Sequence, residues 1–260
     1  MLERMSKFRV MTYNVHSCIG RDKKADPERI ARVIEQYRPD VVALQELDLN
    51  RTLSGGTDQP QRIAEILKMD YHFYSSMKVE EGDYGNAVLS RFPIELIAAG
   101  PLPRITGGTQ STIFEKFLRA AREPRGFLWT QIRLNERTVQ VVTTHLGLTN
   151  HERDKQIKFM LGKDMLGRLS ADDPVIFLGD FNDTHRSHVY RHITADFRDA
   201  QEEIRDVQRM HTFFSFFPFR CLDHVFLRGK IQVSDVDVPR TPLTERASDH
   251  LPMIADVELT

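Results

Sequence analysis

The chain is divided into about ten short apolar runs, separated mostly by residues typical of turns rather than of helices. The runs Phe127–Leu134 and Thr138–Thr144 are joined only through Asn135-Glu136, a spacing typical of a β-hairpin. Apolar residues at helical spacing occur in only about three or four places. Hairpins therefore outnumber helical crossovers, which predicts an α/β protein with two mainly antiparallel sheets rather than a doubly wound parallel sheet.

The helical patterns are few and separated along the chain. One helix is predicted to begin at Pro27, with Asp26 as its N-cap, and to end before Arg38-Pro39. A second is predicted to begin at Asp58-Gln-Pro60, and a third to span roughly Asn150 to Leu169. The sequence shows no repeat, no low-complexity segment and no linker that would separate two domains. We expect residues 1–260 to form a single domain.

The composition is that of a soluble protein, with 40% apolar and 28% charged residues. Thirty-six basic and 37 acidic residues give a net charge of −1, so no global basic field favours capture of nucleic acid. Cys18 and Cys221 are too few for a disulfide scaffold. The N-terminal residues lack the core of a signal peptide, and no apolar run reaches transmembrane length. We expect a cytoplasmic monomer.

The stretch Pro174–Asp183 joins a predicted core strand to polar groups. Val175–Leu178 has the length of a fully buried strand, Gly179 ends the run, and Asp180 and Asn182 follow at alternate positions. Residues two apart on an extended backbone point to the same side, so a carboxylate and a carboxamide would lie together. Such a pair suits a water and a developing negative charge, although the same residues also favour a simple Asx turn.

The same arrangement recurs at other strand ends. Apolar runs lead into Asn14, Gln45-Glu46 and His145, while Asp223 and Asp249-His250 lie beside later strands. Loops at the ends of a rigid sheet are common places for active sites. Oxygen ligands such as Glu46 and Asn14 suit Mg²⁺, whereas zinc spacings and the P-loop, dinucleotide and serine-hydrolase motifs are missing from the sequence. These residues indicate metal-dependent hydrolysis.

Taken in order, the strand-end residues resemble the motifs of the endonuclease/exonuclease/phosphatase superfamily over residues 8–258. The matching segments are Thr-Tyr-Asn14, Leu-Gln-Glu46, Thr-His145, Gly-Asp180-Phe-Asn182, Leu-Asp223 and Ser-Asp249-His250. The resemblance implies a four-layered α/β sandwich, with two sheets packed face to face and helices outside. It also implies a phosphoesterase that uses Mg²⁺, with Mn²⁺ as a substitute, at one end of the two sheets.

The resemblance implies a catalytic role for five residues. Asp180 would orient or deprotonate the attacking water, and Asn182 would steady the water or a phosphoryl oxygen. His250 would hydrogen-bond the phosphate, while Asp223 would fix the orientation of this ring. His145 would contact the phosphate from the opposite side.

The resemblance also implies a metal site and narrows the branch of the family. Glu46 would bind the metal, with Asn14 beside it and Asp249 near it. The apurinic-site endonucleases of the family carry Asp at the position of His16 and Tyr at that of His145. Both differences favour the deoxyribonuclease-like or sphingomyelinase-like branches.

Four residues are assigned with alternatives. Arg125, in Glu-Pro-Arg-Gly126, either clamps a phosphate with its planar guanidinium group or is a surface charge beside a turn. Asn86 is predicted to open a strand and to point into the cleft. His16 either reaches the site or has a structural role in its loop, and His224 is interpreted as structural.

Two segments bear on the choice of substrate. Residues 104–125 carry five positive and two negative charges, which suits either a polyanion or a solvated loop. Residues 211–219 contain five phenylalanines. We expect most of these to lie in the core and one or two to line the cleft, against bases or lipid.

The leading functional prediction is a Mg²⁺-dependent phosphodiesterase or nuclease in which Asp180 activates water. One alternative is hydrolysis of a phospholipid or inositol-phosphate head group at the same site. A catalytically inactive binding module is a third hypothesis, which is disfavoured because no residue of the motif set is missing. The loops 50–60, 78–86 and 100–125 are expected to select the substrate.

Overall fold

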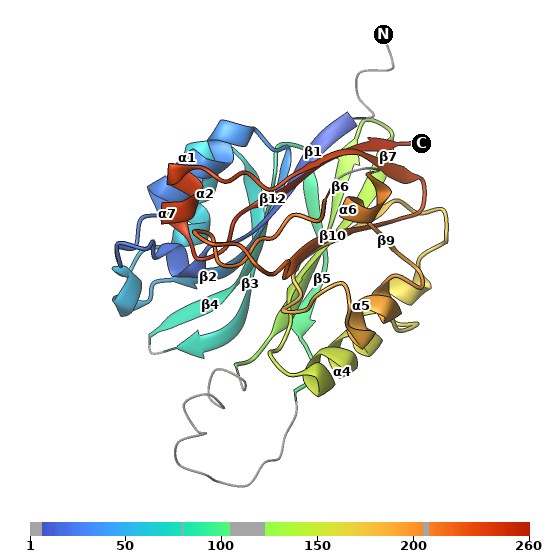
Figure 1. The fold of residues 1–260 in the computed structure, drawn as a ribbon, viewed down its shortest axis with the longest axis horizontal. Helices are drawn as coiled ribbons and strands as arrows, with labels where there is room; N and C mark the ends of the chain where they lie inside the picture. Colours follow the sequence, from blue (N-terminus) through green and yellow to red (C-terminus); the bar gives the residue numbers. More distant parts are fainter. Residues whose placement is uncertain (1–6, 80, 105–122, 205–207) are drawn as a thin grey trace, which may run out of the picture.

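The computed structural model describes residues 7–79, 81–104, 123–204 and 208–260, whose strands form two six-stranded sheets (Figure 1). In spatial order, the first sheet contains β11 (Ile231–Asp237), β12 (Met253–Leu259), β1 (Lys7–Asn14), β2 (Val41–Leu49), β4 (Gly82–Ser90) and β3 (Asp70–Val79). The second contains β5 (Ile94–Pro101), β6 (Gly126–Leu134), β7 (Arg137–His145), β8 (Val175–Asp180), β10 (Asp223–Arg228) and β9 (Arg198–Asp199). Each has one parallel pair at its centre, β1 with β2 and β7 with β8. The other pairs of the described strands are antiparallel, as predicted.

The helices lie on the outer faces of the two sheets (Figure 1). The first sheet is covered by α1 (Pro27–Tyr37), α2 (Gln59–Leu67) and α7 (Pro242–Ala247), and the second by α4 (Asn150–Met160) and α5 (His188–Ile193). The short α6 (Ala200–Glu203) directly follows the edge strand β9. No helix of the described part of the chain is both long and apolar enough to cross a membrane.

Three buried apolar clusters correspond to the three interfaces between layers. Along β2, Val41 belongs to the cluster between the sheets and Val42 to the cluster beneath α1 and α2. Along β8, Ile176 again faces the cluster between the sheets, whereas Phe177 packs toward α4 and α5. Both faces of these strands are buried, which explains why their sequences are continuously apolar. The predicted four-layered sandwich is confirmed.

Two predicted strand boundaries are wrong. The strand expected to end at Gln45-Glu46 continues to Leu49 through a β-bulge, at which Glu46 adopts a φ of 62°. Bulges redirect side chains and are common beside active sites. Asn86 likewise lies inside β4 rather than at its start.

The helix α4 ends at Met160 instead of continuing to Leu169. Gly162 follows and donates its N–H to the carbonyl of Phe159, which closes a turn. The chain then approaches itself closely at Gly167, where a Cβ atom would lie only 2.7 Å from the carbonyl oxygen of Leu161. Glycine permits this approach and ends the helical pattern.

Candidate active site

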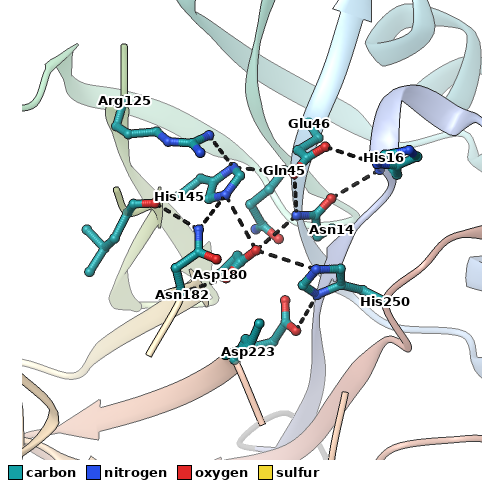
Figure 2. A network of polar contacts seen from close by, with 12 residues as sticks. Asn14, His16, Gln45, Glu46, Arg125, His145, Asp180, Asn182, Asp223 and His250 are labelled. Carbon is teal, nitrogen blue, oxygen red and sulfur yellow. Dashed lines mark hydrogen bonds and ion pairs between the residues drawn. The ribbon is translucent and has the colours of Figure 1, made fainter. Parts of the chain in front are cut away.

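The ends of the central strands of both sheets meet at one edge of the sandwich. Parallel pairing places Asn14, at the end of β1, beside Gln45 of β2. In the second sheet it places His145, at the end of β7, beside Asp180 of β8. Asp223 begins the antiparallel β10 directly opposite Asp180. Side chains of both sheets therefore converge on one cluster (Figure 2).

The carboxylate of Asp180 lies at the centre of this cluster and is 1% exposed. Its Oδ2 atom accepts a hydrogen bond from Nδ2 of Asn14 at 2.9 Å, and its Oδ1 atom accepts one from the backbone N–H of Asn182 at 2.8 Å. The Nε2 atoms of His145 and His250 lie 3.5 Å and 3.8 Å from Oδ2. Asp180 thus contacts groups from both sheets and both imidazoles of the motif set.

His250 and Asp223 form a buried pair. Nδ1 of His250 lies 2.8 Å from Oδ2 of Asp223. Burial opposes protonation of the ring, but the charges of Asp223 and Asp180 raise the pKa of His250 to about 10. Burial and the charge of Asp223 also raise the pKa of Asp180 above its ordinary value. At neutral pH an imidazolium therefore lies beside a carboxylate of increased basicity.

The ring of His145 is neutral, in contrast to the protonated ring of His250. Nη1 of Arg125 lies 3.0 Å from Nδ1 of His145, and a guanidinium group can only donate. Burial, assisted by the charge of Arg125, keeps the pKa of His145 well below its ordinary value, so the ring is neutral. The carboxamide of Asn182 lies 3.0 Å from Nε2 of the same ring and donates to the carbonyl of Leu146 at 2.9 Å.

Arg125 is not a surface charge, because it is only 4% exposed. Its Nη1 atom lies 3.0 Å from the carboxylate of Glu123. Its Nε–H is buried and has no hydrogen-bond partner among the described residues. Buried donors are rarely left unpaired, so this one suits an anionic ligand.

Asn86 lies near this arginine without joining the central cluster. Its Nδ2 atom donates to the carbonyl of Gly126 at 3.3 Å, and the hydroxyl of Thr144 donates to the same carbonyl at 3.2 Å. These bonds fix the start of β6, immediately after Arg125. Within the described residues, Asn86 thus contacts backbone rather than the central cluster.

Glu46 and His16 lie on the other side of Asn14. Glu46 accepts a hydrogen bond from Nδ2 of Asn14 at 2.8 Å, and its second oxygen lies 3.5 Å from Nδ1 of His16. The same nitrogen is 3.7 Å from Oδ1 of Asp249. Contact with Glu46 raises the pKa of His16 to about 8. Burial opposes ionisation of Glu46, but the contact with His16 holds its pKa below the usual range. His16 therefore reaches the site and separates Glu46 from Asp249.

The donors of this cluster fit a hard divalent cation. Ligand atoms of Glu46, His145 and Asp180 lie within 4.8 Å of one another, and so do those of Asp180, Asp223 and His250. In the second group the charge of Asp223 is already balanced by His250. The first group combines two carboxylates, whose oxygen atoms suit Mg²⁺ or Mn²⁺, with a neutral imidazole, a ligand more typical of transition metals than of Mg²⁺. The resemblance assigns His145 a contact with the phosphate rather than a place in the metal site.

The sequence matches a family model described as the endonuclease/exonuclease/phosphatase family over residues 11–250. The chain belongs to this family. The protein YbhP of Escherichia coli strain K12 is 25% identical to it over 268 residues, which cover 97% of this chain and 96% of YbhP. Members of the endonuclease/exonuclease/phosphatase family are phosphoester hydrolases that include nucleases, phosphatases and phosphodiesterases.

Solved structures agree with the fold. An endonuclease/exonuclease/phosphatase from Beutenbergia cavernae DSM 12333 superposes with a TM-score of 0.76 at 23% identity, covering 97% of this chain and 72% of that one. One from Bacteroides vulgatus has a TM-score of 0.74 at 21% identity, covering 98% and 99% of the two chains. These similarities support the four-layered sandwich of the endonuclease/exonuclease/phosphatase fold.

Gln45 belongs to the cluster, although sequence analysis named it only as the neighbour of Glu46 and gave it no role. Its side chain is fully buried, accepts from the hydroxyl of Thr12 at 3.3 Å and donates to the hydroxyl of Thr143 at 3.1 Å. It therefore connects β1 and β2 of the first sheet to β7 of the second, beneath the family's motif residues. A glutamine directly after an apolar strand run is the signal that would have identified it.

The aromatic segment 211–219 contradicts the expectation that its phenylalanines lie mostly in the core. Phe214 is 38% exposed, Phe216 47%, Phe217 69% and Phe219 46%. His224 is buried with Nε2 3.0 Å from the carbonyl of Asp183, a contact in keeping with a structural role. The basic part of the 100–125 loop lies largely outside the described residues, so its contribution to substrate selection stays a prediction.

Proposed function

We propose that this protein is a divalent-metal-dependent phosphodiesterase or nuclease in which Asp180 activates the attacking water. The observation that carries the proposal is the buried Asp180 carboxylate between the imidazolium of His250 and the neutral ring of His145. A buried acid and base of opposite character within one polar cluster is an arrangement for proton transfer.

Asp180 is the proposed general base. A raised pKa brings its basicity closer to neutral pH, while the hydrogen bonds from Asn14 and the backbone of Asn182 hold both oxygens in place. One proton would pass from the water to Asp180 as the water oxygen attacks phosphorus, and the bond between phosphorus and the leaving ester oxygen would break. The carboxamide of Asn182, fixed by the carbonyl of Leu146, would position the water or a phosphoryl oxygen.

His250 and Arg125 are the proposed groups that stabilise the negative charge of the transition state. Asp223 holds Nδ1 of His250 and favours the imidazolium, so that Nε2–H is available to a phosphoryl oxygen. The Nε–H of Arg125, which has no partner among the described residues, offers a second, charge-assisted donor, and His145 would contact the phosphate from that side.

Glu46, with Asn14 beside it, would hold the metal, for which we propose Mg²⁺ with Mn²⁺ as a substitute. When bound, a divalent ion supplies positive charge to the phosphate and the leaving oxygen. Asp249 lies beyond His16 and would act through that ring or through water. We further propose a cytoplasmic, single-domain monomer, which suits the two buried free cysteines.

The test is a substrate panel assayed with Mg²⁺, with Mn²⁺ and with excess chelator. It should contain simple phosphate mono- and diesters, DNA, RNA, inositol phosphates and phospholipids. Asp180→Asn should lower the rate on the best substrate at least ~10²-fold, the usual scale for one catalytic group. Asp172→Asn, which changes an exposed carboxylate paired with Lys230, is the matched control.

Full activity of Asp180→Asn, or full activity in chelator, would overturn the proposal. Turnover of no ester, combined with failure to bind Mg²⁺ in a calorimetric titration, would instead support the inactive binding module.

A further inference from the structure

Four of the seven large hydrophobic side chains that are exposed among the described residues lie in one short segment. We call Phe214, Phe216, Phe217 and Phe219 the aromatic patch. The ring centroids of Phe214 and Phe216 are 6.1 Å apart, and those of Phe214 and Phe219 are 5.8 Å apart. A cluster of exposed large apolar side chains usually marks an interaction surface.

The aromatic patch is built onto the segment that carries His250. The backbone N–H of the buried Ser215 donates to the carbonyl of Asp249 at 2.7 Å, and its hydroxyl donates to the carbonyl of Ser248 at 2.7 Å. The ring of Phe213 lies 4.9 Å from that of His250 and 3.8 Å from that of Phe214, between centroids. A continuous row of rings thus leads from the active site to the exposed surface.

Positive charge surrounds the aromatic patch. The guanidinium of Arg21 lies 4.4 Å from the ring centroid of Phe216, and that of Arg220 lies 5.4 Å from the ring centroid of Phe219. The exposed side chains of Lys23 and Lys24 follow in the same loop, and Asp22, which lies between Arg21 and Lys23, is paired with Arg29 and Arg246. No carboxylate of the described residues lies within 4.0 Å of the cationic groups of Arg21, Lys23, Lys24 or Arg220. The surface is therefore locally cationic, although the whole chain has a net charge of −1.

The arrangement of the rings favours a lipid surface over single-stranded nucleic acid. Stacking of bases needs open ring faces, but Phe214 already packs against Phe213, Phe216 and Phe219. Arg21 and Arg220 each cover one further face, on Phe216 and Phe219. Phe217 is the most exposed of the set, at 69%, and contacts no other ring or cation among the described residues. Aromatic side chains of this kind enter the boundary between head groups and acyl chains, while arginine and lysine bind anionic head groups.

We propose that the aromatic patch docks this protein on an anionic phospholipid bilayer and presents head-group phosphodiesters to the active site. The phospholipid substrate rests on the proposed function, whereas the docking does not. Because Ser215 and Phe213 tie the patch to Ser248–His250, insertion of Phe216 and Phe217 fixes the orientation of the site toward the bilayer.

The test is co-sedimentation with vesicles of phosphatidylcholine, with and without about one third phosphatidylglycerol. The unaltered chain should bind the anionic vesicles more tightly. The double variant Phe216→Ser/Phe217→Ser should bind them at least about tenfold more weakly, because two exposed rings no longer leave water on docking. Phe159→Ser, which alters a 40% exposed phenylalanine on α4, is the matched control and should bind normally.

Circular dichroism and thermal unfolding establish that the variants are folded. If the double variant does not fold, Arg21→Glu/Arg220→Glu takes its place and should abolish the preference for anionic vesicles. Equal binding by the variant and the unaltered chain, or no vesicle binding by the unaltered chain, overturns the docking surface. Binding of the same variants to a single-stranded oligonucleotide is measured alongside. If they lose binding to the oligonucleotide but bind vesicles like the unaltered chain, the proposal is overturned in favour of nucleic acid.

Hydrolysis of the soluble diester bis-para-nitrophenyl phosphate by the unaltered chain separates the two proposals. Hydrolysis without vesicle binding rejects the docking surface and leaves the proposed function in place. Vesicle binding without hydrolysis of this diester or of any member of the substrate panel supports docking and rejects the proposed function.

Discussion

Replacing Asp223 by Asn should change the pH dependence of the reaction through His250. Nδ1 of His250 lies 2.8 Å from Oδ2 of Asp223, and both side chains are buried. Burial disfavours the imidazolium, but the charges of Asp223 and Asp180 raise the pKa of His250 to about 10. Asn keeps the size and an acceptor oxygen but removes one of these charges. The pKa of His250 should therefore fall toward its ordinary value of 6.5.

The size of the effect follows from this fall. A complete fall from about 10 to about 6.5 corresponds to about 5 kcal/mol and is the largest effect expected, because Asp180 keeps its charge. At this limit and at about pH 9, the protonated fraction of His250 drops from nearly all molecules to about one in 300. At about pH 6 it drops only to about three quarters. Since the imidazolium is the proposed active form, the loss of activity should grow from less than about twofold at the lower pH to at most about 300-fold at the higher one.

The assay is kcat/KM against pH for the best ester of the substrate panel. The alkaline limb should move to lower pH, by at most about three pH units, in Asp223→Asn and stay in place in Asp172→Asn. Equal losses at both pH values, or an unmoved alkaline limb, would refute the role of His250 as an imidazolium. An NMR titration of the His250 ring measures the shift without turnover.

Three further changes test other parts of the structure. Arg125→Lys should lower kcat/KM at least about tenfold in steady-state kinetics, because an ammonium group lacks the planar fork, and unchanged kinetics would exclude a phosphate contact. Gly179→Ala should lower the free energy of unfolding in urea by more than about 2 kcal/mol, because φ is 152° and the new Cβ would meet the carbonyl of Thr144. Gly55→Ala places its Cβ in open space and should lower it less. Gln45→Ala should cost about 1–3 kcal/mol by leaving threonine hydroxyls of both sheets unpaired, and an unchanged urea midpoint would contradict this.

The sequence predicts the core strands well because their physical signal is local. Val175–Leu178 is apolar throughout, since its residues alternate between the interface of the sheets and the layer of α4 and α5. The N-cap at Asp26 and the following Pro27 also act locally, and α1 begins where they indicate. The short elements α5, α6, α7 and β9 have too few residues to show a periodicity.

The convergence of the site is partly predictable. Polar residues after several strands indicate a common edge once the strands are ordered into sheets, and Asn14, His145, Asp180 and Asp223 do meet there. The bulge that aims Glu46 has no signature in its own sequence. It arises from the register of β2 against β4, which depends on residues about forty positions away.

Other site features depend on tertiary contacts that no local pattern encodes. Arg125 is buried because it packs against His145 and Glu123. Of its two alternatives, the surface charge beside a turn is therefore wrong. For the aromatic patch the error is the reverse, because residues predicted to be mostly buried are exposed. Hydrophobicity predicts burial of residues 211–219. However, the N–H and the hydroxyl of Ser215 donate hydrogen bonds to backbone carbonyls before β12, and these bonds hold the neighbouring rings outside the core.

The side chain of Asn14 spans the junction between the two sheets, since it donates to Glu46 of the first and to Asp180 of the second. Asn14 and Asp180 are 166 positions apart in the chain, so their contact closes a very long loop. Contacts of such separation form late in folding. Recovery of turnover after dilution from denaturant should therefore lag behind recovery of the β-sheet signal, and catalysis would report the final docking of one half of the sandwich on the other.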